Sequence, residues 1–239
     1  MSFNEENIFM RSGFEFVSYK QKQKINGKSD IIYRVTGKER TGTNYIHSMI
    51  KNNFEDVNFY IYKFGGKHAL PPRHKMYKNP KILKEIENRT FICVLTIKNP
   101  YMWANSIGGW KPAYKAYRID NWFPKQHMIN YNNFYYSYKK LLEGGCEGCS
   151  FDDIILVRYE DMLENEEREL NRISLKFKTP CENNLRSPEK VPFSKSFSKE
   201  KRQYYLEQRP PYGRRVIKKV NEFLNWDIMR FYGYEKIEV

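Results

Sequence analysis

The sequence lacks the features of a membrane-spanning or secreted protein. No stretch approaches the roughly 18 consecutive apolar residues that a helix needs to cross a bilayer. Residues 1–6 are polar and acidic, and no apolar signal-peptide segment follows them. From these absences we expect a soluble, cytoplasmic protein that does not interact with a membrane.

Cysteine is scarce, with four residues in a chain of 239, which is too few for a disulfide scaffold at this length. Cys93 lies within the apolar run Phe91–Ile97 and is typical of a small core residue. Cys146 and Cys149 have metal-knuckle spacing, but no second close pair and no histidine cluster accompanies them. Because structural zinc takes four ligands, we expect a glycine-rich turn there and no bound metal.

Acidic residues are outnumbered by basic ones, 28 against 42, which gives a formal net charge of +14. Such a charge steers anions towards a protein, so the charge alone leaves nucleic acids, an anionic membrane surface, sulfated glycans and a small polyphosphate cofactor as candidate partners. The basic residues are nevertheless scattered along the chain, as they are on a generally lysine-rich surface. With 40% hydrophobic and 16% aromatic residues, the chain can form one large folded domain.

Residues 1–30 are polar and predict an N-terminal extension, and residues 31–239 predict a single domain. Apolar, β-branched runs indicate buried strands, as parallel central strands are apolar nearly throughout. The expected strands are Ile31–Thr36, Val57–Phe64, Phe91–Ile97 and Ile154–Val157. The expected helices are Tyr45–Ile50, Pro80–Asn88, Tyr101–Ile107, Lys125–Leu142, Glu160–Lys176, Lys199–Gln208 and Arg214–Phe231, the last with Gly233 as its C-cap.

Strands that alternate with helices predict an α/β fold of three layers, in which a mostly parallel central sheet has helices on both faces. Ligands bind such sheets outside the carboxyl ends of the strands. The loops that follow the predicted strands are therefore the places to look for chemistry.

The loop after the first predicted strand resembles the beginning of a phosphate-binding P-loop. Gly37 and Gly42 are separated by four residues, and such a loop holds anions with backbone N–H groups and a helix N-terminus. A nucleoside triphosphatase continues with Lys and then Ser or Thr, whereas here Thr43 and Asn44 follow. A cation, Arg40, comes earlier instead. The loop fits a phosphate that needs neither γ-phosphate transfer nor metal, and a purely structural turn remains the alternative.

A second candidate segment, Lys98–Ser106, follows the buried strand Phe91–Ile97 and opens a helix. Lys98 stands at the end of the strand, and Ser106 lies two turns into the helix. A cation and a hydroxyl placed in this way can hold a second phosphate.

Taken together, these segments resemble the sulfotransferases that use 3′-phosphoadenosine 5′-phosphosulfate (PAPS). Arg40–Thr43 resembles their 5′-phosphosulfate loop, and Lys98–Ser106 resembles their 3′-phosphate motif. Ile155–Leu163 is similar to their strand and acidic helix, and Phe223–Tyr234 looks like their usual ending. The family usually has Arg in the place of Lys98; Lys keeps the charge but loses the bidentate geometry.

The resemblance implies a P-loop NTPase-like fold and transfer of a sulfuryl group from PAPS to a hydroxyl or amine, without metal, leaving 3′-phosphoadenosine 5′-phosphate (PAP). Arg40 is the expected cation for the leaving phosphate. The residues expected to bind the cofactor are Lys38, Arg40, Thr41, Gly42, Thr43, Asn44, Lys98 and Ser106.

The expected general base is His68, since histidine suits proton abstraction near neutral pH. It stands beside Lys67, which is also expected to be catalytic, in a segment that resembles the family's Lys-x-His-x-Pro element with the register shifted by one. An ordinary loop histidine is the alternative. His74 and Glu160 are weaker candidates for the base, and Tyr159 is expected to face the site.

The acceptor is predicted only as a small molecule or a glycan. Basic loops at 67–78 and 186–202 would suit an anionic glycan, whereas Trp103, Trp110 and Trp122 would suit a sugar face or a phenol. Arg214 and Arg215 would add a cation to the 3′-phosphate.

Two other functions remain open. A P-loop kinase would depend on magnesium and ATP, and the missing Lys-Ser/Thr ending argues against it. A basic nucleic-acid-binding protein would use the positive charge and stacking aromatics. The sequence contains no recognised nucleic-acid-binding motif, so nucleic acid is not the expected partner.

Overall fold

The computed structural model describes residues 30–59, 67–68, 70–71, 89–108, 125–144, 151–182, 185–188, 202–203, 206–207 and 214–239. The predicted N-terminal extension lies outside the described residues except for Asp30. The helix predicted over 80–88 and most of the one predicted over 199–208 also lie outside them.

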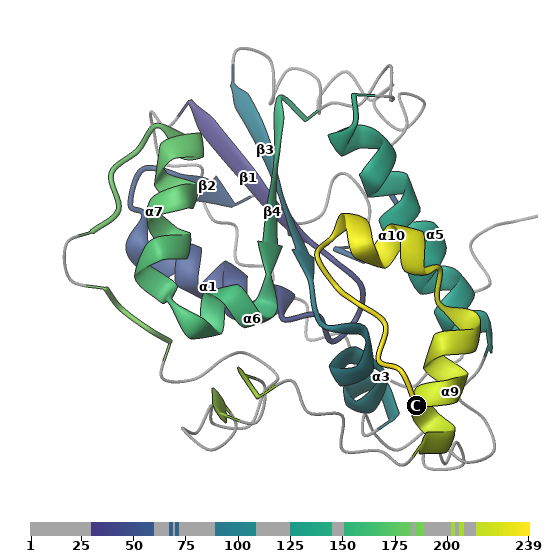
Figure 1. Cartoon of the computed structure of the whole chain (residues 1–239). Coiled ribbons are helices and arrows are strands. Elements are labelled where there is room, and N and C mark those ends of the chain that lie inside the picture. Colours follow the sequence, from purple (N-terminus) through teal and green to yellow (C-terminus); the bar gives the residue numbers. More distant parts are fainter. Residues whose placement is uncertain are drawn as a thin grey trace, which may run out of the picture.

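Within the described residues, four parallel strands form a sheet in the order β2-β1-β3-β4 (Figure 1). Their bounds are β1 Ile31–Thr36, β2 Asn58–Phe59, β3 Thr90–Ile97 and β4 Asp153–Arg158. β1 and β3 pair with Thr36 opposite Leu95, and β3 and β4 pair with Ile97 opposite Arg158. All pairings in the described part are parallel, which confirms the parallel strands expected from the apolar runs.

β3 is apolar nearly throughout because side chains on both of its faces are buried. Ile92 and Val94 contribute to one hydrophobic core, while Cys93, Leu95 and Ile97 contribute to another. Successive side chains of a strand point to opposite faces, so a strand covered on both sides has no solvent-facing positions. Cys93 is fully buried, as predicted.

Helices cover both faces of this sheet. The helices are α1 Thr43–Asn53, α3 Pro100–Gly108, α5 Lys125–Leu142, α6 Tyr159–Glu164, α7 Glu166–Phe177, α9 Arg214–Phe223 and α10 Trp226–Phe231. Side chains of α1, α6 and α7 belong to the first core, and those of α5, α9 and α10 to the second, with the two groups on opposite sides of the sheet (Figure 1). The predicted three-layer α/β arrangement is therefore present. No described helix has both the length and the apolarity needed to cross a membrane.

Two of the predicted helices are each divided by an asparagine, so their prediction as single helices is wrong. Asn165 separates α6 from α7, and its side chain accepts the backbone N–H three residues on. Asn225 separates α9 from α10 and accepts the N–H groups two and three residues on. An asparagine side chain competes with the helix for backbone donors, so it starts a new helix instead of continuing the old one.

Gly233 ends α10, as predicted, in the left-handed conformation with φ of 80°. The Gly233 N–H donates to the Arg230 carbonyl at 2.9 Å, and the Tyr234 N–H donates to the Met229 carbonyl at 3.0 Å. This pair of bonds is a Schellman motif. It turns the last residues of the chain back from α10 towards α3 (Figure 1).

The strand order places a switch point between β1 and β3. From β1 the chain moves outwards to β2, and from β3 it moves outwards in the opposite direction to β4. In open parallel sheets, the crevice at such a reversal, outside the carboxyl ends of the strands, is where ligands bind. The loops after Thr36 and Ile97 both begin there.

Candidate active site

The loop between β1 and α1 needs glycine at both ends because neighbouring groups leave no room for a side chain. A Cβ at Gly37 would lie 2.1 Å from Thr96 Oγ1 and 2.6 Å from the Thr96 backbone oxygen. Gly42 has φ of 89°, and a Cβ there would lie 2.2 Å from the Tyr159 ring. Close packing against β3 and α6 therefore explains the Gly-x₄-Gly spacing.

Helix α1 begins at this loop with its N-terminus uncapped by any side chain. Gly42 is the N-cap, no side chain accepts a hydrogen bond there, and the first turn has no acidic residue. The hydrogen-bonded turns start with the Ile46 N–H, which donates to the Gly42 carbonyl at 3.0 Å. The partial positive charge of the helix N-terminus is thus not offset by a carboxylate within the first turn, an arrangement that favours an anion.

Thr41 shapes this loop from the inside. Its hydroxyl donates to the Lys38 carbonyl at 2.7 Å and lies 3.0 Å from Thr96 Oγ1, and its N–H also donates to the Lys38 carbonyl, at 3.2 Å. Its side chain is fully buried. Thr41, one of the predicted cofactor-binding residues, therefore holds the loop in its conformation.

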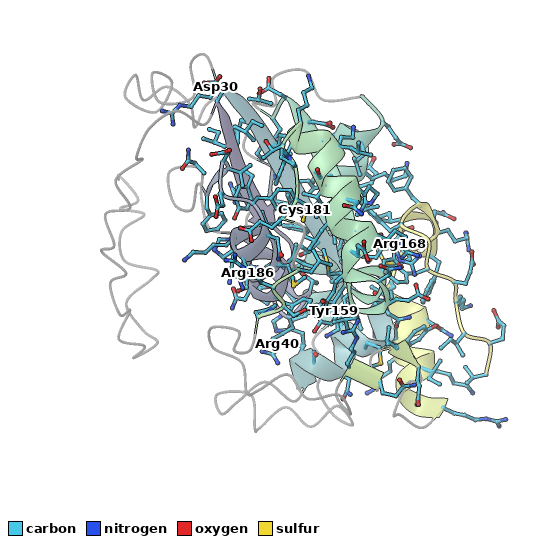
Figure 2. The ribbon with its side chains drawn as sticks, turned by 90° about the vertical axis from the view of Figure 1, so that its left-hand side faces the viewer. Asp30, Arg40, Tyr159, Arg168, Cys181 and Arg186 are labelled. Carbon is cyan, nitrogen blue, oxygen red and sulfur yellow. The ribbon has the colours of Figure 1, made fainter. Side chains whose placement is uncertain are left out.

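The cations of the loop point in different directions. Lys38 Nζ lies 3.2 Å from the Glu39 carboxylate and 5.7 Å above the Phe134 ring, so it faces α5. Arg40 is exposed, with φ of 69°. Figure 2 shows Arg40 at the opposite end of the molecule from Asp30, which precedes β1. Arg40 thus lies at the carboxyl end of the sheet, where a ligand would approach.

Lys67 and His68 attach directly to the same loop. The Lys67 carbonyl accepts the Gly37 N–H at 3.0 Å and the Thr36 hydroxyl at 2.8 Å. The Lys67 ammonium donates to Asn44 Oδ1, and His68 Nδ1 lies 2.6 Å from the Gly37 carbonyl oxygen. The two predicted catalytic residues therefore lie beside the predicted phosphate loop.

The hydrogen bond of His68 assigns its tautomer. A carbonyl oxygen only accepts, so Nδ1 carries the proton and donates, which leaves a lone pair on Nε2. Burial lowers the pKa of His68, and the bond to Gly37 opposes this shift only in part. Burial likewise lowers the pKa of Lys67, against the attraction of Glu39. His68 is therefore neutral near pH 7, in the form that accepts a proton.

The second predicted phosphate segment brings its cation and its hydroxyl together. Lys98 is only 3% exposed, and its Nζ lies 3.3 Å from Ser106 Oγ and 4.7 Å above the Tyr159 ring. Its carbonyl accepts the Tyr131 hydroxyl at 3.0 Å. The ring face and the hydroxyl hold the buried ammonium at the end of β3.

The two segments that were predicted to bind phosphate lie side by side. The Trp103 indole N–H donates to the Glu39 carbonyl at 2.8 Å, and Thr41 meets Thr96 as described above. Trp103 is 1% exposed, and its ring centre lies 4.1 Å from that of Tyr131. Trp103 is therefore a brace between α3 and the loop, and the prediction that it suits a sugar face or a phenol is wrong. Trp110 and Trp122 lie outside the described residues.

Glu160, the alternative base, has both carboxylate oxygens engaged. Oε1 accepts the Asn99 N–H at 2.9 Å, and Oε2 accepts the Tyr234 hydroxyl at 2.8 Å. The residue is 3% exposed, and burial raises its pKa. These contacts give it a structural role. Tyr159 beside it covers Gly42 and Lys98 and thus faces the site, as expected.

The other candidate histidines and basic residues make none of the described contacts with the candidate site. His47 stacks on Phe59 with ring centres 3.7 Å apart, and its Nδ1 lies 3.2 Å from the Tyr33 hydroxyl oxygen, contacts that give it a structural role. Arg214 is exposed at the start of α9. His74, Cys146, Cys149 and the side chain of Arg215 lie outside the described residues.

Two buried tyrosines of α5, Tyr131 and Tyr135, support the site although they are not among the residues predicted from the sequence. The Tyr135 hydroxyl donates to the Thr96 carbonyl at 2.8 Å, as Tyr131 does to Lys98. The spacing of four residues, which places both rings on one helix face, was the available signal. These hydroxyls hold the carboxyl end of β3 in place.

Within the described ranges, no three or more His, Cys, Asp and Glu side chains gather into a group that could hold a metal ion. No protein-family model matches the chain, and no curated protein does so either. Function is therefore inferred from the chemistry of the site.

Proposed function

We propose that the chain is a sulfotransferase with a P-loop-like nucleotide site that takes its sulfuryl group from PAPS. One observation supports this most. Three segments far apart in sequence, 37–44, 67–68 and 98–106, meet at the switch point of the sheet through direct hydrogen bonds. They bring an uncapped helix N-terminus, a neutral histidine and a buried lysine with a hydroxyl partner to one edge.

The residues fit a nucleotide that carries phosphate at two positions. The N-terminus of α1 and exposed Arg40 would hold the 5′-phosphosulfate. Lys98 and Ser106, already 3.3 Å apart, would hold the 3′-phosphate. Thr43 and Asn44 occupy the places where a kinase has its phosphate-binding lysine and its magnesium-binding hydroxyl, so a nucleoside triphosphate fits less well.

His68 and Lys67 would perform the chemistry beside this loop. PAPS supplies an activated sulfuryl group when bound. His68 would accept the proton of the acceptor hydroxyl or amine at Nε2, because Nδ1–H is committed to Gly37. Lys67, released from Asn44, and Arg40 would stabilise the negative charge that develops on the leaving phosphate. The acceptor is proposed to be a small molecule or a glycan.

Thermal-shift titration with PAP, AMP and ATP tests the proposal. PAP should stabilise the protein more than AMP at equal concentration, because only PAP engages Lys98 and Ser106. Lys98→Met should abolish this preference, whereas the matched control Lys218→Met, an exposed lysine on α9, should keep it.

Other outcomes point to the alternative functions. Stabilisation by ATP only with magnesium would instead indicate a kinase. Steeply salt-dependent oligonucleotide binding, with no preference for a 3′-phosphate, would indicate a nucleic-acid-binding protein.

A further inference from the structure

The end of the chain packs against the segment that carries Lys98. The Tyr234 hydroxyl donates to Glu160 Oε2 at 2.8 Å, and Glu160 Oε1 accepts the Asn99 N–H at 2.9 Å. Tyr234 is 2% exposed and Glu160 is 3% exposed. A buried chain of hydrogen bonds therefore runs from the C-terminal segment through β4–α6 to the residue next to Lys98.

This chain holds one particular peptide unit. The Asn99 N–H and the Lys98 carbonyl belong to the same planar peptide group. Glu160 accepts from its N–H, and the Tyr131 hydroxyl donates to its carbonyl at 3.0 Å. With both ends engaged by buried side chains, the backbone from which the Lys98 side chain leaves has a defined orientation.

Further contacts hold Tyr234 in its place. The Arg158 guanidinium carbon lies 4.6 Å from the centre of the Tyr234 ring. Further along, the Ile237 N–H donates to the Tyr101 hydroxyl at 2.8 Å, and Asn221 Nδ2 donates to the Ile237 carbonyl at 2.8 Å. The C-terminal segment is thus attached both to α3, which carries Ser106, and to α9.

We propose that Tyr234 is a positioning residue for the 3′-phosphate site, acting through Glu160 and the Lys98–Asn99 peptide on the Lys98 ammonium. This inference rests on the proposed nucleotide site. Its consequence is that the C-terminal segment determines the preference for a 3′-phosphate without touching the nucleotide. Tyr234→Phe removes only the hydroxyl, so Glu160 keeps its bond to the Asn99 N–H but loses the contact that fixes its other carboxylate oxygen.

The test compares PAP and AMP affinities of the full-length chain by titration. Tyr234→Phe should weaken PAP binding about 5-fold, the size of one ordinary net hydrogen bond, and leave AMP binding unchanged. The matched control is Tyr232→Phe, since the Tyr232 hydroxyl is equally buried but donates to the Tyr135 carbonyl at 2.8 Å. This control should lower stability without changing the ratio of PAP to AMP affinity. That ratio separates positioning from a merely structural role.

Two more variants complete the test. Glu160→Gln keeps the shape of the side chain but loses an acceptor, and should reduce the same ratio. In a Lys98→Met background, Tyr234→Phe should have no further effect on PAP binding, because its effect passes through Lys98. If the wild type prefers PAP but Tyr234→Phe and Tyr232→Phe keep the same ratio, the positioning role is overturned and the proposed function stands. If the wild type shows no preference for PAP, both are overturned.

Discussion

The two halves of the candidate nucleotide site are built by different means. The loop from Gly37 to Gly42 is shaped by its backbone, with glycines where neighbouring atoms leave no space and a helix N-terminus for the anion. The Lys98–Ser106 half depends on side chains from distant elements that orient one buried ammonium. The first half is therefore sensitive to added atoms, and the second to the loss of single polar groups.

The largest effect is expected at His68, which belongs to the loop half through its bond to Gly37. His68→Asn keeps a donor for the Gly37 carbonyl but has no basic nitrogen, so sulfuryl transfer to an acceptor should fall about 100- to 10,000-fold. PAP affinity should not change.

The wild-type enzyme should lose turnover only as the pH falls through the pKa of His68. Because burial lowers that pKa, wild-type activity should persist at pH values below the ordinary pKa of histidine. The measurement is the pH profile of transfer from PAPS to a panel of phenols and sugars; undiminished turnover of His68→Asn would remove His68 as the base.

The next largest effect is expected from a substitution in the loop half, which is shaped by its backbone. Gly42→Ala adds a Cβ 2.2 Å from the Tyr159 ring in a left-handed conformation, and should lower the free energy of unfolding by about 3 kcal/mol. Gly144→Ala is the control, because Gly144 has φ of 78° but open space around it, and should cost about 1 kcal/mol. Denaturant unfolding measures both. Equal losses would show that Tyr159 moves aside and that packing does not require the second glycine.

The side-chain half is tested by removing its cation. Lys98→Met should weaken PAP binding about 10- to 100-fold, as expected for losing a charged partner of a phosphate, and leave AMP binding unchanged. Isothermal titration with both nucleotides measures the change. Equal weakening of PAP and AMP would place Lys98 at the 5′ end of the nucleotide and contradict the division into two halves.

The loop half was largely predictable from the sequence because its information is local. A strand, two glycines four residues apart and a helix are adjacent in the chain, and so are Lys98 and the helix that carries Ser106. The burial of Trp103 and the engagement of Glu160 were not predictable, since each depends on contacts with residues about 60 positions away. The division of the two helices had a local signal, because asparagine is a common N-cap. The hydrophobic periodicity taken by itself nevertheless indicated one continuous helix in each case.

Arg40 tests the difference between the two halves of the site, because it is an exposed cation in the loop half. Arg40→Ala should weaken PAP and AMP alike, by about 5- to 10-fold, because both carry the 5′-phosphate. The ratio of the two affinities should stay at the wild-type value, in contrast to Lys98→Met. A selective loss of PAP affinity would instead place Arg40 at the 3′-phosphate.

The smallest effect is expected at His47 on α1, the helix that follows the loop, and concerns the pH dependence of stability. Burial lowers the pKa of His47 on α1 from 6.5 to about 4, whereas in the unfolded chain it titrates normally. As the pH falls below about 6.5, the unfolded state takes up a proton that the folded state does not, so stability declines towards acid. Between about pH 7 and about pH 5.5, His47→Gln should therefore lose about 1 kcal/mol less stability than the wild type. Tyr33→Phe, which removes the hydroxyl bonded to His47 but keeps the histidine, is the control and should retain the wild-type pH dependence. Parallel pH profiles of His47→Gln and wild type, measured by denaturant unfolding, would mean that His47 takes up its proton in the folded protein as readily as in the unfolded chain, so that burial does not lower its pKa.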